Sequence, residues 1–335
     1  MVIYRSRAPL RVSFAGGGTD MPDWAKKYGG QIISTAIDKY VYVSAQPTGT
    51  KEVIVHAYDL NSTSKFLITE LTYNGDSDLI KVVLKHFKIQ DGWEIFIHSD
   101  MPAGSGMGTS SSLIVALIAL FARVTHQNLN KYGIAELAFR LEREELKQAG
   151  GYQDQYAAAF GGFNFMTFNE RVTVFPLKFS FELLHELNYR LILCYTGKTH
   201  FSSDIQKSLL ANLQKMDKQA SMLALKEYAT QFRDLLAQEN LAELDKVGEI
   251  LHKAWLAKKA TNDKVTTDTI ENLYLHSLQE GAVGGKILGA GGGGCLLLMA
   301  KATERTNLIR KLQQLGGEII PFAFEPEGVI SWEID

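Results

Sequence analysis

The chain has 335 residues, of which 46% are hydrophobic and 21% are charged, a composition that allows two hydrophobic cores. Its 35 basic and 37 acidic side chains nearly cancel, which argues against a nucleic acid or a membrane surface as partner. The two cysteines are too few for a disulfide framework. No signal peptide is recognised, and the longest apolar stretch, residues 113–122, is too short to span a bilayer. We therefore expect a cytoplasmic protein.

Strands and helices alternate through the first part of the chain. Alternating apolar residues predict strands, whereas apolar residues three and four apart predict helices. Pro9 is expected to interrupt the first strand, and the glycines at residues 16–18 to end its continuation. Strands are predicted at residues 2–4, 10–15, 31–37, 40–45, 53–57, 65–68, 93–98, 161–166 and 172–175, and helices at residues 77–87, 109–124 and 130–147.

The pattern changes after a further strand predicted at residues 189–195. Residues 202–256 and 265–278 are predicted to be largely helical. The remaining elements are strands at residues 282–288, 295–300, 318–324 and 328–332, and a helix near residues 304–315. We expect two closely packed domains, residues 1–190 and 191–335, because no long linker separates the two halves.

The most informative segment is residues 102–112, which lies between a predicted strand and a long apolar helix. Its glycines, Gly104, Gly106 and Gly108, allow positive φ and a close approach of a phosphate to the backbone. The hydroxyl run that begins at Thr109 and Ser110 caps a helix N-terminus, which presents free N–H groups and the positive end of the dipole. An ordinary capped turn needs fewer small residues. The segment therefore predicts a polyphosphate site.

Two familiar nucleotide motifs do not fit. A Walker A sequence ending at residues 197–199 would need a glycine where Ile192 stands. The pattern GxGxxG fits formally at Gly289, Gly291 and Gly294, but it leads into an apolar strand rather than a helix. A dinucleotide-dependent oxidoreductase is therefore a weak alternative.

Two further glycine-rich segments and one acidic segment complete the set. They are residues 7–20, residues 289–294, and residues 150–155 with the acidic stretch at 142–145. A turn needs one or two glycines, so the near-continuous run at 289–294 predicts backbone packed against something large. Taken alone, Asp154 would be interpreted as a helix cap and the acidic stretch as a solvated helix face.

In this order and spacing, the three glycine-rich segments resemble the signature motifs of the GHMP kinases, a superfamily named for galactokinase, homoserine kinase, mevalonate kinase and phosphomevalonate kinase. Residues 8–20 and 151–156 are most similar to the D-glycero-D-manno-heptose 7-phosphate kinases of that superfamily. Galactokinases carry Gly-Glu-His-Thr-Asp where residues 16–20 read Gly-Gly-Gly-Thr-Asp, and mevalonate kinases carry lysine at the place of Arg11. The resemblance implies an α+β fold with an N-terminal α/β domain that has a left-handed crossover, and a ferredoxin-like C-terminal domain.

The resemblance also implies ATP and Mg²⁺ as cofactors and a role for each motif residue. Asp154 matches the general base, and Arg11 matches the residue that neutralises charge near the base and the transferring phosphoryl group. Ser110 and Glu142 match the magnesium ligands. The residues matched to the ATP phosphates are Gly104, Ser105, Gly106, Gly108, Thr109 and Ser110, and those matched to the sugar are Gly17, Gly18, Thr19, Asp20 and Gly292.

These implied roles suit phosphoryl transfer, which needs positioning and charge neutralisation rather than covalent help. The expected reaction is transfer to the anomeric hydroxyl of heptose 7-phosphate, which gives the 1,7-bisphosphate. Lys198 and His200 are candidates for contacting the phosphate already on the sugar, although the heptose kinase group would have arginine at His200. The alternatives are a kinase of a free sugar such as fucose and a catalytically silent sugar- or nucleotide-binding protein. Self-association into a homo-oligomer stays open.

Overall fold

The first two strands, β1 (Ile3–Ala15) and β2 (Gly30–Pro47), form the antiparallel centre of the computed structural model, which describes residues 2–197, 205, 208 and 216–335. The expected break at Pro9 is wrong, because β1 runs through it. A register shift between Pro9 and Leu10 accommodates the residue that lacks an N–H. Likewise, the two strands predicted between residues 31 and 45 are both parts of β2.

This pair is the centre of an eight-stranded sheet with the order β12-β1-β2-β5-β3-β4. The first half of β2 pairs with β6, which in turn pairs with β7, and its second half pairs with β5. Among the described strands of this sheet, β3 and β5 alone pair in parallel. The bounds of these strands are β3 (Glu52–Ala57), β4 (Ser62–Leu67), β5 (Trp93–Ser99), β6 (Phe163–Phe168), β7 (Val172–Leu177) and β12 (Ile330–Ile334).

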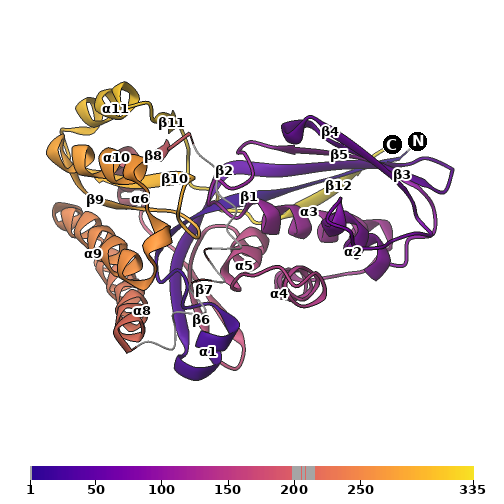
Figure 1. Ribbon diagram of the computed structural model, residues 1–335, viewed down its shortest axis with the longest axis horizontal. Coiled ribbons are helices and arrows are strands. Elements are labelled where there is room, and N and C mark those ends of the chain that lie inside the picture. Colours follow the sequence, from indigo (N-terminus) through magenta and orange to yellow (C-terminus); the bar gives the residue numbers. More distant parts are fainter. Residues whose placement is uncertain (1, 198–204, 206–207, 209–215) are drawn as a thin grey trace.

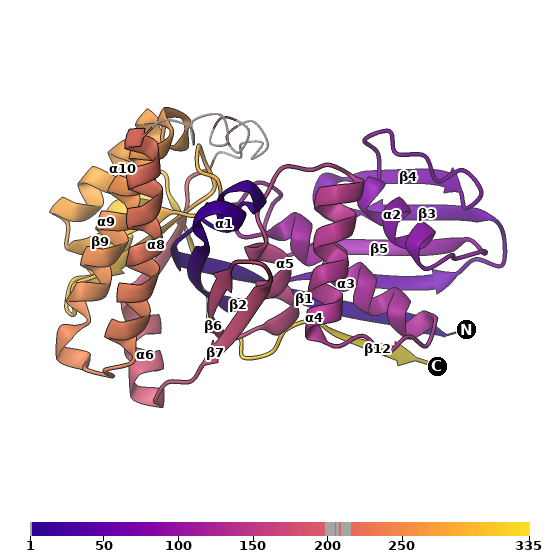
Figure 2. The ribbon, with the colours of Figure 1, turned by 90° about the horizontal axis from the view of Figure 1, so that it is seen from below.

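Helices α2 to α5 lie together on one side of this sheet (Figures 1 and 2). Helix α3 is buried along almost its whole length and packs on β1 and β2, as its apolar run predicts. The helix predicted at residues 130–147 is two elements, because α4 ends at Phe139 and a π-helical turn, η2, follows. The bounds are α1 (Pro22–Tyr28), α2 (Asp78–His86), α3 (Thr109–Val124), α4 (Lys131–Phe139), η2 (Arg140–Glu145) and α5 (Gln153–Phe160).

The second sheet is antiparallel, with the order β11-β8-β10-β9. Numbered along the chain, this is the order 4-1-3-2 of a ferredoxin-like domain, with helices between its first and second strands and between its third and fourth. The strands are β8 (Leu191–Tyr195), β9 (Ala282–Ile287), β10 (Cys295–Ala300) and β11 (Glu318–Ile320), and the helices are α8 (Met216–Leu236), α9 (Asp245–Thr261), α10 (Asp268–Gln279) and α11 (Arg305–Gln314). Helix α6 (Phe181–Arg190) precedes β8, and 3₁₀ turns occur at Tyr58–Leu60, Leu241–Glu243 and Asp263–Val265.

The two sheets are joined by apolar packing. Helix α8 packs against β1 and β2, and Phe14 of β1 stacks on Phe232 of α8 with 4.8 Å between ring centroids. The expected α+β fold is confirmed. The last strand, β12, belongs by sequence to the second expected domain, residues 191–335, but it pairs with β1 in the first sheet. Within the described residues, none of the helices combines the length and hydropathy that crossing a bilayer requires.

Candidate active site

A cleft of about 1010 Å³ brings the segments singled out in the sequence to one place. It is lined by residues of the loop after β1, the loop between β5 and α3, the π-helical turn and the start of α5. The lining also includes Arg11 of β1 and Ser110 of α3, so that it brings together Arg11, Asp20, Ser110, Glu142 and Asp154, which lie far apart in the sequence.

The loop before α3 adopts the conformation that its glycines predict. Gly104, Gly106 and Gly108 each have φ of +80°, in the left-handed region that side chains disfavour. Helix α3 begins at Thr109, so its first N–H groups are available at the cleft. Ser105 is fully buried and its hydroxyl lies 3.4 Å from that of Thr109. This geometry suits an anionic ligand such as a phosphate chain.

The glycine run at residues 289–294 packs against that loop. A Cβ atom on Gly289 would lie 2.6 Å from the Cα of Gly106, and one on Gly294 would lie 2.5 Å from the carbonyl oxygen of Ser105. Backbone therefore contacts backbone here, as the run predicts. Gly292 donates its N–H to the carbonyl of Val265 at 2.8 Å and is not among the cleft-lining residues, so its expected contact with the sugar has no support in this geometry.

Arg11 and Asp154 form an ion pair across the cleft. The guanidinium Nε and Nη2 lie 2.9 Å and 2.7 Å from Asp154 Oδ1, and Nη1 donates to the carbonyl of Gly106 at 2.6 Å. Arg11 is 3% exposed, whereas the Asp154 side chain is 21% exposed and faces the cleft. One arginine thus ties the second residue of α5 to the glycine-rich loop before α3.

Glu142 is fully buried among hydrogen-bond donors. Ser110 Oγ donates to its Oε1 at 2.9 Å, and Ser111 Oγ donates to its Oε2 at 2.8 Å. Gln155 Nε2 donates to Oε2 at 2.6 Å, and Arg143 lies 3.3 Å from Oε1. The π-helical turn delivers this carboxylate to the start of α3, and such turns are frequent at functional sites.

The loop after β1 is held by its own polar side chains. Asp20, 1% exposed, accepts the N–H of Gly18 at 3.1 Å and that of Gln153 at 3.0 Å. Burial raises the pKa of Asp20 above its usual value, and the nearby Asp154 carboxylate adds to this rise. Thr19 is fully buried and donates to the carbonyl of Gly16, so it braces the loop and does not line the cleft. Gly17, Gly18 and Asp20 do line it.

Comparison with known proteins decides the family. Residues 77–162 match the model of the GHMP kinases N terminal domain. D-glycero-alpha-D-manno-heptose 7-phosphate kinase of Campylobacter jejuni is 36% identical over the full length of both chains. The chain belongs to the GHMP kinases. The expected kinase activity is thereby confirmed, and the oxidoreductase alternative is rejected.

Two further relatives of this GHMP kinase bear on its substrate. A solved structure described as a D-glycero-D-manno-heptose 1-phosphate kinase from Bacteroides thetaiotaomicron has a TM-score of 0.81 and 29% identity, with 99% of both chains covered. A bifunctional fucokinase/GDP-fucose pyrophosphorylase of Arabidopsis thaliana is 26% identical over 90% of this chain but only 30% of its own length.

Some residues of the GHMP kinase site escaped the sequence-based prediction. Ser111 and Gln155 were within reach, since they neighbour Ser110 and Asp154 in the quoted motifs. Lys258 lines the same cleft from α9, and a lysine in an amphipathic helix carries no signal that distinguishes it from a solvated one. Lys198 and His200 lie outside the described residues.

Proposed function

We propose that this GHMP kinase transfers the γ-phosphoryl group of ATP to the anomeric hydroxyl of D-glycero-D-manno-heptose 7-phosphate and so forms the 1,7-bisphosphate. The single observation that carries the proposal is the Arg11–Asp154 ion pair, which is bonded directly to the phosphate-binding loop inside one cleft. The full-length similarity to the Campylobacter jejuni heptose kinase supports the choice of substrate. ATP use implies a compartment that supplies it, and the proposal therefore includes the cytoplasm.

The proposal assigns Asp154 the role of general base. Its Oδ1 is held by Arg11, which leaves the second carboxylate oxygen to accept the proton of a sugar hydroxyl. An anomeric hydroxyl is more acidic than the other hydroxyls of a sugar, so a weak carboxylate base is sufficient. Arg11 orients this carboxylate and offers positive charge beside the loop, where negative charge shifts during transfer.

Mg²⁺ fits the side chains at the start of α3. This ion is held in kinases by one or two protein oxygens together with phosphates and water. Ser110 Oγ and Glu142 Oε1 are a hydroxyl and a carboxylate oxygen 2.9 Å apart, and both residues line the cleft. The proposal assigns these two residues to the ion, which when bound would offset the charge of the phosphates. The proposal keeps Asp20, which lines the cleft, as the carboxylate that holds sugar hydroxyls; it also joins the loop after β1 to the start of α5 by accepting the N–H of Gln153.

Replacing Ser110 with alanine is expected to raise the Mg²⁺ concentration for half-maximal rate by about 10-fold or more. The cause is the loss of one ligand oxygen, so excess Mg²⁺ should restore part of the rate. Ser112→Ala is the matched control. The buried hydroxyl of Ser112 donates to the backbone carbonyl of Pro9 and not to the carboxylate of Glu142. A magnesium titration of the steady-state rate checks both variants, and an unchanged requirement in Ser110→Ala would remove this residue from the metal site.

The names of the relatives differ on which phosphate the sugar already carries, since one is a 7-phosphate kinase and the other a 1-phosphate kinase. Substrate preference is therefore tested with four acceptors: heptose 7-phosphate, heptose 1-phosphate, free heptose and fucose. ADP release should be fastest with heptose 7-phosphate. Preference for free fucose would favour the fucokinase alternative, and absence of turnover with every sugar would favour a silent binding protein.

A further inference from the structure

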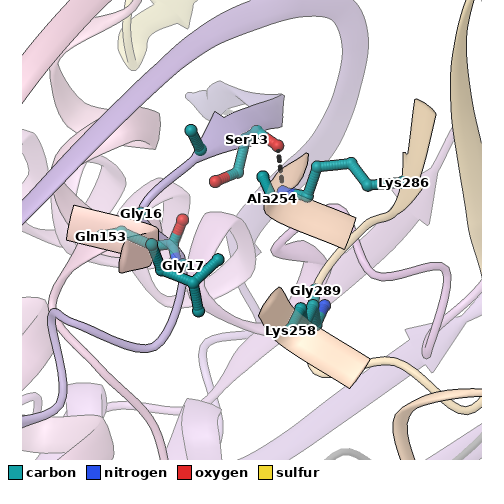
Figure 3. A pocket seen from close by; sticks show the side chains of 10 residues that line it. Ser13, Gly16, Gly17, Gln153, Ala254, Lys258, Lys286 and Gly289 are labelled. Carbon is teal, nitrogen blue, oxygen red and sulfur yellow. Dashed lines mark hydrogen bonds between the residues drawn. The ribbon is translucent and has the colours of Figure 1, made fainter. Parts of the chain in front are cut away.

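Lys258, in the last turn of α9, carries an amine into the wall of the active-site cleft. Its Nζ donates to the carbonyl oxygen of Gly289 at 2.5 Å and lies 3.3 Å from that of Ile287. An ammonium group has three N–H donors, so two carbonyls leave one donor over. Lys258 lines the cleft. It also lines a small cavity of its own (Figure 3).

This amine lies close to the ion pair of the site. Lys258 holds the carbonyl of Gly289 and Arg11 holds the carbonyl of Gly106, and the backbones of these two glycines touch. A second lysine, Lys286, is buried and donates to the carbonyl of Ser13 at 2.6 Å (Figure 3). Within the part of the chain that the structure describes, neither lysine is within 4.0 Å of a carboxylate oxygen, and Asp154 pairs with Arg11. Among the described residues, these two amines therefore have backbone carbonyls and no carboxylate as their partners.

The small cavity that Lys258 lines has polar atoms that lack hydrogen-bond partners. Ser13 Oγ and Gln153 Oε1 are buried without a hydrogen bond, and both residues line it. Its volume of about 10 Å³ corresponds to room for roughly one water molecule. The wall beside Lys258 is thus polar and incompletely bonded, which is expected where bound ligand and water supply the missing partners.

We propose that Lys258 binds an oxygen of the transferring phosphoryl group, beside Arg11 and the phosphate-binding loop, and so stabilises the charge that moves during transfer. This inference rests on the proposed kinase reaction. Lysine binds phosphate as a point charge. The third N–H of the Lys258 ammonium group, which no backbone carbonyl of the described residues accepts, can donate to a phosphate oxygen. A phosphate already on the sugar has the same chemistry, but the contact of Gly289 with Gly106 sets Lys258 at the reacting end.

Protonation of Lys258 gives this contact a measurable signature. Burial, together with the positive charge of Arg11, lowers the pKa of Lys258 to about 7. Above pH 7 the free enzyme therefore holds mostly the neutral amine. A bound phosphate favours the ammonium form, because an opposite charge raises the pKa of an amine. Binding of a nucleotide triphosphate at pH 7.5 should consequently take up protons, by at most about 0.8 per site.

Calorimetric titration with Mg²⁺ and the β,γ-imido analogue of ATP, in buffers of different ionisation enthalpy, measures that uptake without turnover. Wild type should take up protons, and Lys258→Met should take up fewer by several tenths of a proton. Lys258→Gln should behave in the same way while retaining an amide donor for Gly289. Lys253→Met, an exposed lysine of the same helix, is the control and should match wild type. Equal uptake in all four proteins would overturn the assignment.

Kinetics of the same variants then separate the two phosphates. Lys258→Met should lower kcat by about 10²-fold, comparable to the loss of one donor at a transition-state oxygen, with the KM for the sugar nearly unchanged. Unchanged kcat with a raised KM for phosphorylated but not for free sugar would overturn the proposal in favour of the sugar's own phosphate. Failure of the wild type to phosphorylate any sugar would instead refute the proposed function. The calorimetric measurement of proton uptake would then still test whether Lys258 contacts the nucleotide phosphates.

Discussion

Asp154→Asn is expected to lower kcat by about 10²–10⁴-fold, the usual contribution of a general base. Asparagine has nearly the same shape as aspartate, and its amide oxygen can still accept from Arg11, whereas it cannot take a proton from the sugar hydroxyl. The fold and the affinity for ATP should therefore stay close to wild type. Steady-state rates, thermal unfolding and nucleotide titration of the purified variant measure the three quantities.

The matched control is Asp23→Asn, because Asp23 is an exposed aspartate in the first turn of α1, just as Asp154 is in the first turn of α5. Both substitutions remove the favourable interaction of a carboxylate with a helix N-terminus, and Asp154→Asn in addition removes the charge of the Arg11 ion pair and the proposed base. Near-wild-type turnover of Asp154→Asn would refute its assignment as the base.

Arg11→Met is expected to lower kcat by about 10²-fold or more, because a charge placed beside the moving phosphoryl group is lost. It should also destabilise the fold, since the carbonyl of Gly106 and the carboxylate of Asp154 each lose a buried donor. Arg7→Met in the same strand is the control; Arg7 stacks over Tyr40 and does not line the cleft.

A double variant tests whether Arg11 and Asp154 act as one unit. If Arg11 works through the carboxylate that it orients, then Arg11→Met combined with Asp154→Asn should lose much less than the product of the two single losses. Rates of the two single variants and the double variant give this comparison. Losses that multiply in full would show that the two residues act independently.

Local patterns explain why so much of the site was predictable. Positive φ at a glycine is set by nearby residues, so the loop at Gly104–Gly108 and the start of α3 at Thr109 are readable from the sequence. The expected hydroxyl cap is wrong, because Gly108 is the N-cap of α3 without a side-chain bond, and Ser110 Oγ donates to Glu142 instead. The apolar run of α3 is equally local. Contacts between distant segments have no such signal, and for this reason the return of β12 to β1 and the position of Lys258 were not predicted.

Some residues of the glycine-rich motifs do not line the cleft. Thr19 belongs to the substrate motif, yet its hydroxyl is used within its own loop. Gly292 belongs to the third motif, yet its N–H bonds Val265. A sequence motif contains both residues that shape a loop and residues that face the cleft. The structure is needed to tell which residue does which. The π-helical turn that presents Glu142 is a further case, because the sequence pattern continues as an ordinary helix.

Phosphorus NMR of the reaction product tests the central claim most directly. With heptose 7-phosphate as acceptor, the account predicts a new phosphate resonance that couples to the anomeric proton, together with the retained 7-phosphate signal. A new phosphate on any other carbon, or the appearance of inorganic phosphate alone, would contradict transfer to the anomeric hydroxyl.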